Sequence, residues 1–121
     1  MERTIEISGK SVPFKATAGT IRVYRALFGR DLLLDFKTLQ ASMGEDKELT
    51  ADALTIFENL AFTMAKQADP ENVPNDPDTW LDEFDMFSIY EVLPQLVALW
   101  GISMVPTAKQ KKNQKPAPTD L

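Results

Sequence analysis

Two short segments near the start of the chain alternate apolar and polar side chains, which is the pattern of β-strands with one buried face. The inward positions of the two segments are Ile5, Ile7, Val12 and Phe14. Gly9 and Lys10 lie between the segments at a turn position, so the pattern predicts a β-hairpin. Pro13 has no amide proton to donate to a neighbouring strand, which makes the second strand an edge strand. Because an isolated hairpin is marginally stable in water, we expect this one to pack on helices.

Helical periodicity begins after the hairpin and predicts three helices in succession. The first covers residues 17–29, with Gly29 as its C-terminal stop, and the second covers residues 30–44. The third covers residues 51–68, with Thr50 as its N-cap. The apolar positions that face the core are predicted to be Ile21, Tyr24, Leu27 and Phe28 in the first helix, Leu32, Phe36, Leu39 and Met43 in the second, and Leu54, Phe57, Ala61, Met64 and Ala68 in the third.

A proline-rich segment separates these helices from the last part of the chain. Residues 69–77 read DPENVPNDP, and their three prolines end the helical pattern. Asp78 is positioned to cap a short helix that ends near residue 85. Ser88 and Glu91 then have the spacing of a capping box, in which each side chain accepts a hydrogen bond from the other end's backbone. This spacing predicts that a last helix begins there.

The last helix, which the pattern carries to Trp100 with Gly101 behind it, is apolar around nearly its whole circumference. Its polar residues form one narrow stripe made of Ser88, Glu91 and Gln95. A helix of this kind must be buried nearly all round. Two interpretations follow: either it is the central helix of a small bundle, or one face packs inside while another meets a second molecule. The tryptophan and tyrosine at its two ends suit the second role, because both bury area while keeping a polar tip.

Pro94 lies inside this last helix and removes one of its backbone hydrogen bonds. A proline in mid-helix costs about 3 kcal/mol or more unless the chain bends or restarts there. We therefore expect a kink, or two helical pieces that meet near Leu93.

The length of 121 residues fits one domain, and a composition of 44% hydrophobic and 26% charged residues is that of a globular protein. The elements above predict an α+β fold that is mainly α, with an N-terminal β-hairpin packed on about five helices. The globular domain is expected over residues 1–101. Residues 102–121 are polar, rich in lysine and proline and without apolar periodicity, so we expect them to form a disordered tail.

The sequence gives no sign of a membrane or secretory segment. Its longest apolar run, residues 96–102, is far shorter than the ~20 residues that cross a bilayer. The first ten residues lack the basic-then-apolar order of a signal peptide, and the chain has no cysteine for a disulfide framework. We therefore expect a cytosolic protein without a membrane partner.

The absence of histidine and cysteine limits the chemistry available to this chain. Without them it lacks the usual zinc ligands, the common general base near neutral pH and the usual partner of a serine nucleophile. We expect no enzyme, no metal and no cofactor. A small carboxylate-based hydrolase is the remaining enzymatic alternative, but no close acidic pair is distinguished from the surface acids. The loop that starts at Asp69 fails the EF-hand pattern, because Val73 and Pro74 take positions that need an oxygen ligand and a glycine.

Charge is distributed unevenly along the chain. Residues 1–101 hold 17 acidic and 9 basic side chains, a net charge of −8, whereas residues 102–121 have a net charge of +3. An acidic body argues against a nucleic-acid partner, which requires a basic face along the phosphates. No basic residue occurs from Gln67 to Ala108. This acidic stretch is either a solvated face or a docking surface for a basic partner, and the Lys109–Lys115 segment of a neighbouring copy is one such partner.

Three arginines, Arg22, Arg25 and Arg30, surround the junction of the first two predicted helices. They either contact a partner or pair with surface acids such as Asp31 and Asp35. Exposed pairs of this kind contribute little to stability.

Two motifs in this chain, together with the hairpin, carry a resemblance to a known family. "VYRALFGRDLLLDF" (Val23–Phe36), "WLDEFDMFSIYEVLPQLVALW" (Trp80–Trp100) and the N-terminal "IEISGKSVPFKAT" resemble, in their order and spacing, the tail assembly chaperones of long-tailed, siphovirus-type bacteriophages of Gram-positive hosts. The likeness spans residues 1–101. Its motifs are packing patterns, and neither is catalytic.

The resemblance implies a non-enzymatic role in tail assembly. Such proteins are made in the host cytoplasm and are absent from the mature virion. They are thought to coat the long, helical and poorly soluble tape measure protein and to help recruit tail tube subunits around it. Family members often occur in a short form and in a longer form made by programmed ribosomal frameshifting, which is associated with recruitment of the tail tube protein. The present chain would be the short form.

Aromatic side chains are concentrated in one 21-residue window. We hypothesise that five of them contribute to self-association, as an oligomer, or to contact with the tape measure protein: Trp80, Phe84, Phe87, Tyr90 and Trp100. The alternative class is a small acidic adaptor or inhibitor that binds one protein partner as a monomer. A monomer without dye-accessible apolar surface would favour that alternative.

Overall fold

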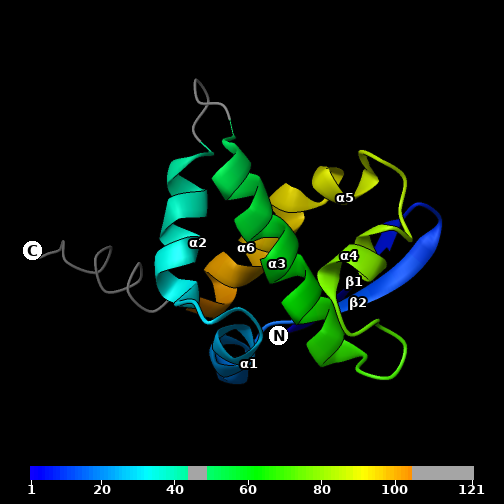
Figure 1. Ribbon diagram of the computed structural model, residues 1–121, viewed down its shortest axis with the longest axis horizontal. Helices are drawn as coiled ribbons and strands as arrows, with labels where there is room; N and C mark the ends of the chain where they lie inside the picture. Colours follow the sequence, from blue (N-terminus) through cyan, green and yellow to red (C-terminus); the bar gives the residue numbers. More distant parts are fainter. Residues whose placement is uncertain (44–48, 105–121) are drawn as a thin grey trace, which may run out of the picture.

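The structure of the chain, a computed structural model, describes residues 1–43 and 49–104, with side chains up to residue 99. The described part is an α+β fold that is mainly α, with one antiparallel hairpin followed by six helices (Figure 1). The strands are β1 (Glu2–Ile7) and β2 (Lys10–Lys15), and the helices are α1 (Ala18–Phe28), α2 (Leu32–Ala41), α3 (Ala51–Ala68), α4 (Pro77–Leu81), α5 (Ser88–Glu91) and α6 (Leu93–Met104). The predicted fold class is therefore confirmed. None of these six helices is both long and apolar enough to cross a bilayer.

The N-terminal hairpin has a two-residue turn made of Ser8 and Gly9, one residue earlier than the sequence pattern suggested. Their φ angles of 53° and 78° are both positive, as a type I′ turn requires. Such a turn matches the twist of the two strands, which explains the shift from the predicted Gly9-Lys10 position. The predicted inward residues are all buried: Ile5, Ile7, Val12 and Phe14. The hairpin packs on α3 through β2.

α3 is the central helix of the fold. It crosses the middle of the molecule in Figure 1 and contacts β2, α1, α2 and α4. The predicted N-cap is confirmed, because Thr50 Oγ1 accepts a hydrogen bond of 3.1 Å from the amide of Ala53. The buried face is much wider than the predicted stripe and consists of Ala53, Ile56, Phe57, Leu60, Ala61, Phe62, Thr63, Met64 and Ala65. The interpretation that placed the last helix at the centre is therefore wrong.

α1 follows the predicted pattern except at Leu27, and a polar contact fixes it on α3. Gln67 Nε2 donates to Thr17 Oγ1 at 2.9 Å, and Thr20 Oγ1 donates to Gln67 Oε1 at 2.5 Å. Of the predicted core residues, Tyr24 is buried, Ile21 and Phe28 are half-buried, and Leu27 is 42% exposed. Thr20, which was not predicted, is buried at the contact with Gln67. Gly29 ends the helix as predicted, in the left-handed conformation with φ 66°.

α2 follows the predicted pattern closely. Asp31 caps it by accepting a hydrogen bond of 2.9 Å from the amide of Leu33. Three of the four predicted core positions are buried on the helix: Leu32, Phe36 and Leu39. The fourth, Met43, comes after the helix ends at Ala41 and is half-buried. The predicted stop at Gly44 lies outside the described residues.

The proline-rich loop after α3 is organised by a side chain that the sequence pattern did not single out. Lys66 Nζ donates to the carbonyl of Pro70 at 2.9 Å, to the carbonyl of Val73 at 2.7 Å and to Asn75 Oδ1 at 3.0 Å. α4 is then capped two residues earlier than predicted. Asp76, not Asp78, accepts the capping hydrogen bond from the amide of Thr79 at 2.9 Å, and Pro77 takes the first helical position, where its missing amide proton costs nothing.

The last apolar segment is divided into two helices, as its proline predicted. α5 ends at Glu91, and α6 begins at Leu93, so Pro94 lies in the first turn of α6. The predicted capping box is absent, because Ser88 Oγ bonds to the carbonyl of Asp85 instead of an α5 amide. Gly101 lies within α6, which continues to Met104 rather than stopping at Trp100. The predicted tail otherwise lies outside the described residues.

α6 has one buried side and one exposed side. Ile89 and Val92 lead into it, and its buried residues are Leu93, Leu96 and Leu99. Pro94, Gln95 and Ala98 are exposed. The helix is therefore not buried all round.

Candidate interaction surface

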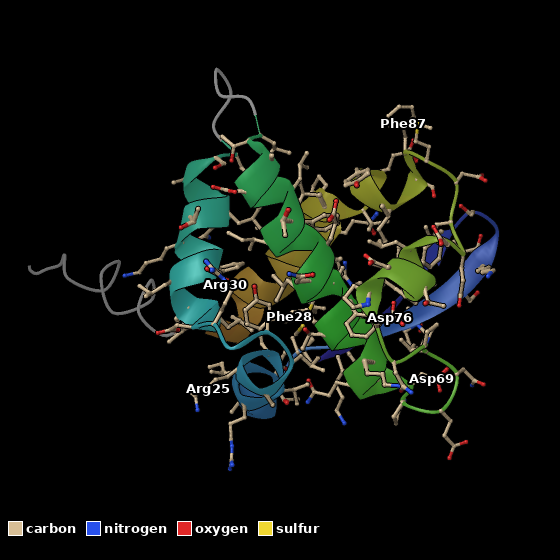
Figure 2. The ribbon with its side chains drawn as sticks, viewed as in Figure 1. Arg25, Phe28, Arg30, Asp69, Asp76 and Phe87 are labelled. Atoms are coloured by element: carbon tan, nitrogen blue, oxygen red, sulfur yellow. The ribbon has the colours of Figure 1, made fainter. Side chains whose placement is uncertain are left out.

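The most exposed apolar side chains of the described chain lie next to each other in the connection between α4 and α5. Met86 is 77% exposed and Phe87 is 70% exposed. Figure 2 shows Phe87 at the edge of the molecule, directed away from its body. Fully solvated large apolar side chains side by side are an unfavourable arrangement for a free molecule and a common one at interaction sites. We refer to Met86 and Phe87 together as the apolar knob.

The loop that presents the knob is fixed to the hairpin turn by hydrogen bonds. Ser8 Oγ accepts a hydrogen bond of 3.0 Å from the amide of Asp85 and lies 2.7 Å from Ser88 Oγ. Ser88 Oγ in turn donates to the carbonyl of Asp85 at 3.0 Å. Both residues that flank the knob are therefore bonded to one hairpin side chain. The turn conformation of Ser8 directs its hydroxyl to this loop, so the knob is held in place before any partner binds.

Trp80, on α4, is the largest side chain of an aromatic cluster. It is 2% exposed, and its ring makes edge contacts with Phe14, Phe62 and Phe84 at centroid distances of 6.5, 6.0 and 5.1 Å. Phe84 is half-buried and lies 5.8 Å from Lys10 Nζ, which also forms an ion pair of 3.4 Å with Glu83. Trp80 thus connects α4 to the hairpin and to α3.

Tyr90, on α5, follows the knob in sequence and connects α5 to α3. Its hydroxyl donates a hydrogen bond of 2.6 Å to Glu58 Oε2, and its ring lies 6.0 Å from that of Phe57. The hydrogen bond to the Glu58 carboxylate, together with burial, raises the pKa of Tyr90 to about 12. The side chain is half-buried, so only part of it faces solvent.

The five predicted site residues therefore differ in what they offer to a partner. Phe87 is exposed, Phe84 and Tyr90 are half-buried, and Trp80 belongs to the core and offers no surface. The side chain of Trp100 lies outside the described residues. Met86 was missed, although it is the most exposed large apolar residue described, because a methionine outside any helical stripe carries no periodic signal.

Acidic side chains flank the knob along the chain. Asp82, Glu83, Asp85 and Glu91 are exposed along the same segment. Of these, Glu83 forms an ion pair with Lys10, and no ion pair links the other three to a basic residue within the described ranges. No group of acidic side chains there is arranged to hold a metal ion. The knob is thus a small apolar surface within a negatively charged rim.

The second group of exposed apolar residues lies where α1 meets α2. Leu27 is 42% exposed, Leu33 43% and Leu34 61%. We refer to these three leucines as the elbow. Arg22 and Arg25 are exposed on α1, and Figure 2 shows Arg25 directed away from the molecule. Neither arginine forms an ion pair with a described residue.

Arg30, the third arginine, pairs with an acid as the sequence suggested. Its Nε and Nη2 donate to the two carboxylate oxygens of Asp35, each at 2.7 Å, and the buried Tyr24 hydroxyl donates to Asp35 Oδ2 at 2.7 Å. The Arg30 guanidinium in particular lowers the pKa of Asp35, and the Tyr24 hydrogen bond adds to this effect. Asp35 is the one acid buried in the described chain, and it is held as an anion that anchors α2. A general acid would need a raised pKa, which is the opposite arrangement.

Comparison with protein-family models, with curated proteins and with solved structures gave no match for this chain. A function must therefore be inferred from the contacts and charges described above.

Proposed function

We propose that this chain is a non-enzymatic tail assembly chaperone of a long-tailed bacteriophage, which self-associates and binds the tape measure protein during tail morphogenesis in the host cytoplasm. The proposal combines the resemblance of residues 1–101 to that family with one structural observation. That observation is the apolar knob, exposed within an acidic rim and held in place by Ser8. Recruitment of the tail tube protein through a longer frameshifted form is part of the same proposal.

The knob supports this role for physical reasons. A protein that coats a poorly soluble helical partner needs exposed apolar surface to contact other chains and charge to keep the coated assembly in solution. Met86 and Phe87 supply the apolar surface, and the acids from Asp82 to Glu91 supply the charge. Many copies along one rod also need contacts between copies, and a knob on one side of the molecule is suited to such contacts.

Co-expression with a tape measure fragment tests the function directly. We expect the wild-type chain to keep the fragment in the soluble fraction, and Phe87→Asp to reduce the soluble fragment several-fold, because a charge replaces the centre of the apolar contact. The matched control is Ala51→Asp, which adds the same charge at an exposed position in the first turn of α3, where the helix dipole favours it.

Equal solubility of the fragment with wild type, Phe87→Asp and an empty vector would contradict the chaperone role. A wild-type chain that stays monomeric and binds one partner stoichiometrically would instead support the adaptor or inhibitor class.

A further inference from the structure

We propose that the apolar knob of one copy docks on the elbow of a second copy, so that copies of this chain join head to tail. The inference rests on the proposed function in one respect, the self-association, and names the two faces that carry it. Both faces consist of exposed apolar side chains: Met86 and Phe87 on one, Leu27, Leu33 and Leu34 on the other.

The charges around the two faces are opposite in sign. Asp82, Asp85 and Glu91 flank the knob along the chain and form no ion pair with a described residue, whereas Glu83 is neutralised by Lys10 of the hairpin. No basic residue occurs from Gln67 to Ala108. α1 and α2, which carry the elbow, hold three basic side chains, Arg22, Arg25 and Lys37, and the link between the two helices holds a fourth, Arg30. Charge complementarity of this kind steers association and excludes copies that approach knob to knob.

The acids near the elbow leave this positive charge in place. Asp35 is buried and neutralised by Arg30, so the two cancel. Asp31 accepts the capping hydrogen bond of α2, and Asp52, in the first turn of α3, lines one cavity with Arg30 and acts on its charge. Arg22, Arg25 and Lys37 outnumber these two acids, so the elbow keeps a positive net charge.

The α1–α2 junction, which carries the elbow, and the start of α5, which follows the knob, lie far apart in Figure 1, so the two faces do not meet within a single copy. Figure 2 shows Phe87 at one edge of the molecule and Arg25 at the opposite edge. A knob and an elbow that belong to different surfaces form a heterologous interface, which leaves one free knob and one free elbow after every addition. Association of this kind continues to a chain or a ring rather than stopping at a symmetric dimer.

The knob loop is also fixed in advance, which reduces the entropy lost on docking. The hydrogen bonds of Ser8 with Asp85 and Ser88 hold the residues on both sides of Met86 and Phe87. Preorganisation of this kind improves affinity without adding contacts.

Two half-blocked variants test the pairing. Phe87→Asp blocks the knob and leaves the elbow intact, whereas Leu34→Asp blocks the elbow and leaves the knob intact. Leu34 is 61% exposed in the first turn of α2, where an acidic side chain is compatible with the helix. By light scattering we expect each variant alone to have the 13.6 kDa mass of one chain at concentrations where wild type is larger. Their equimolar mixture should have twice that mass and no more, because one intact knob meets one intact elbow.

A mixture that stays monomeric while both variants keep the wild-type circular dichroism and unfolding midpoint would overturn the pairing. Either variant alone keeping the wild-type mass would also overturn it.

A charge exchange provides a second test at exposed positions. Asp85→Lys and Arg25→Glu should each weaken association at low salt, and a chain that carries both changes should recover it. Additive weakening in the double variant would count against the contact.

The outcomes separate this inference from the proposed function. A chain that keeps the tape measure fragment soluble while the two half-blocked variants fail to pair would overturn the head-to-tail contact alone. If the two variants pair as expected but the wild-type chain does not keep the tape measure fragment soluble, the contact between copies is supported and the tape measure protein is rejected as the binding partner.

Discussion

Replacing Trp80 by alanine is expected to lower the free energy of unfolding by about 3–5 kcal/mol, the range for deleting a large aromatic side chain from a packed core. Trp80 is 2% exposed and contacts aromatic rings of β2, α3 and the segment after α4. Its removal leaves a cavity where these elements meet. Urea denaturation followed by far-UV circular dichroism measures the change.

Two comparison variants make this prediction specific. Trp80→Phe keeps an aromatic ring in the cluster and should cost clearly less than the alanine change. Phe87→Ala removes an exposed ring and should change the free energy of unfolding by no more than about 0.5 kcal/mol. Similar losses for Trp80→Ala and Phe87→Ala would contradict the division between a core tryptophan and a surface phenylalanine.

Replacing Asp35 by asparagine is expected to lower the free energy of unfolding at pH 7 by about 1–3 kcal/mol, because the buried hydroxyl of Tyr24 and the Arg30 guanidinium lose their shared anion. Asparagine has nearly the same shape, so the change removes charge without creating a cavity. Urea denaturation of both proteins at pH 7 gives the difference. An unchanged midpoint would show that the anion contributes nothing.

The pH dependence of this difference follows from the lowered pKa of Asp35. A carboxyl group whose pKa is lower in the folded than in the unfolded state stabilises the fold above its unfolded pKa of about 3.9. That contribution is lost as the pH falls through the lower, folded value. The gap between wild type and Asp35→Asn should therefore be constant from pH 7 to about 5 and should close below pH 4. A gap that widens on acidification would contradict the assignment.

Local signals in the sequence were sufficient for several elements of the fold. Alternation around residues 5–14 predicted the hairpin, and Thr50 with the periodic run behind it predicted α3 to the residue. Pro94 predicted the division of the last segment, because proline has no amide proton and is tolerated in the first turn of a helix but not in its interior. In each case the determining interaction lies within a few residues of the element.

Features fixed by distant contacts were predicted less well. The rotation of α1 depends on Gln67, which lies about fifty residues away in sequence from its partners Thr17 and Thr20. The Ser88 hydroxyl, which bonds to the Asp85 carbonyl instead of capping a helix, also lies 2.7 Å from the hydroxyl of Ser8, 80 residues away in sequence. Apolar composition marked the last helix as central, but the mixed pattern of α3, with alanine and threonine among its buried residues, produced the wider buried face.

The candidate surface shows the same limit. Aromatic density directed the hypothesis to the window from Trp80 to Trp100, but it did not separate the buried Trp80 from the exposed Phe87. That separation depends on the hairpin, which covers Trp80 with Phe14 and fixes the loop at Asp85. Similarly, helical periodicity predicted that Leu27 faces the core, but the side chain is exposed in the orientation that the contact with Gln67 gives to α1.

The mass of the purified chain across a concentration series, measured by light scattering with and without residues 105–121, tests the central claim of a self-associating chaperone most directly. We predict a mass that rises above the 13.6 kDa of one chain as concentration increases, and that falls with added salt because opposite charges steer the contact. A mass of 13.6 kDa at every concentration, for both lengths of the chain, would contradict the claim and favour a monomeric adaptor.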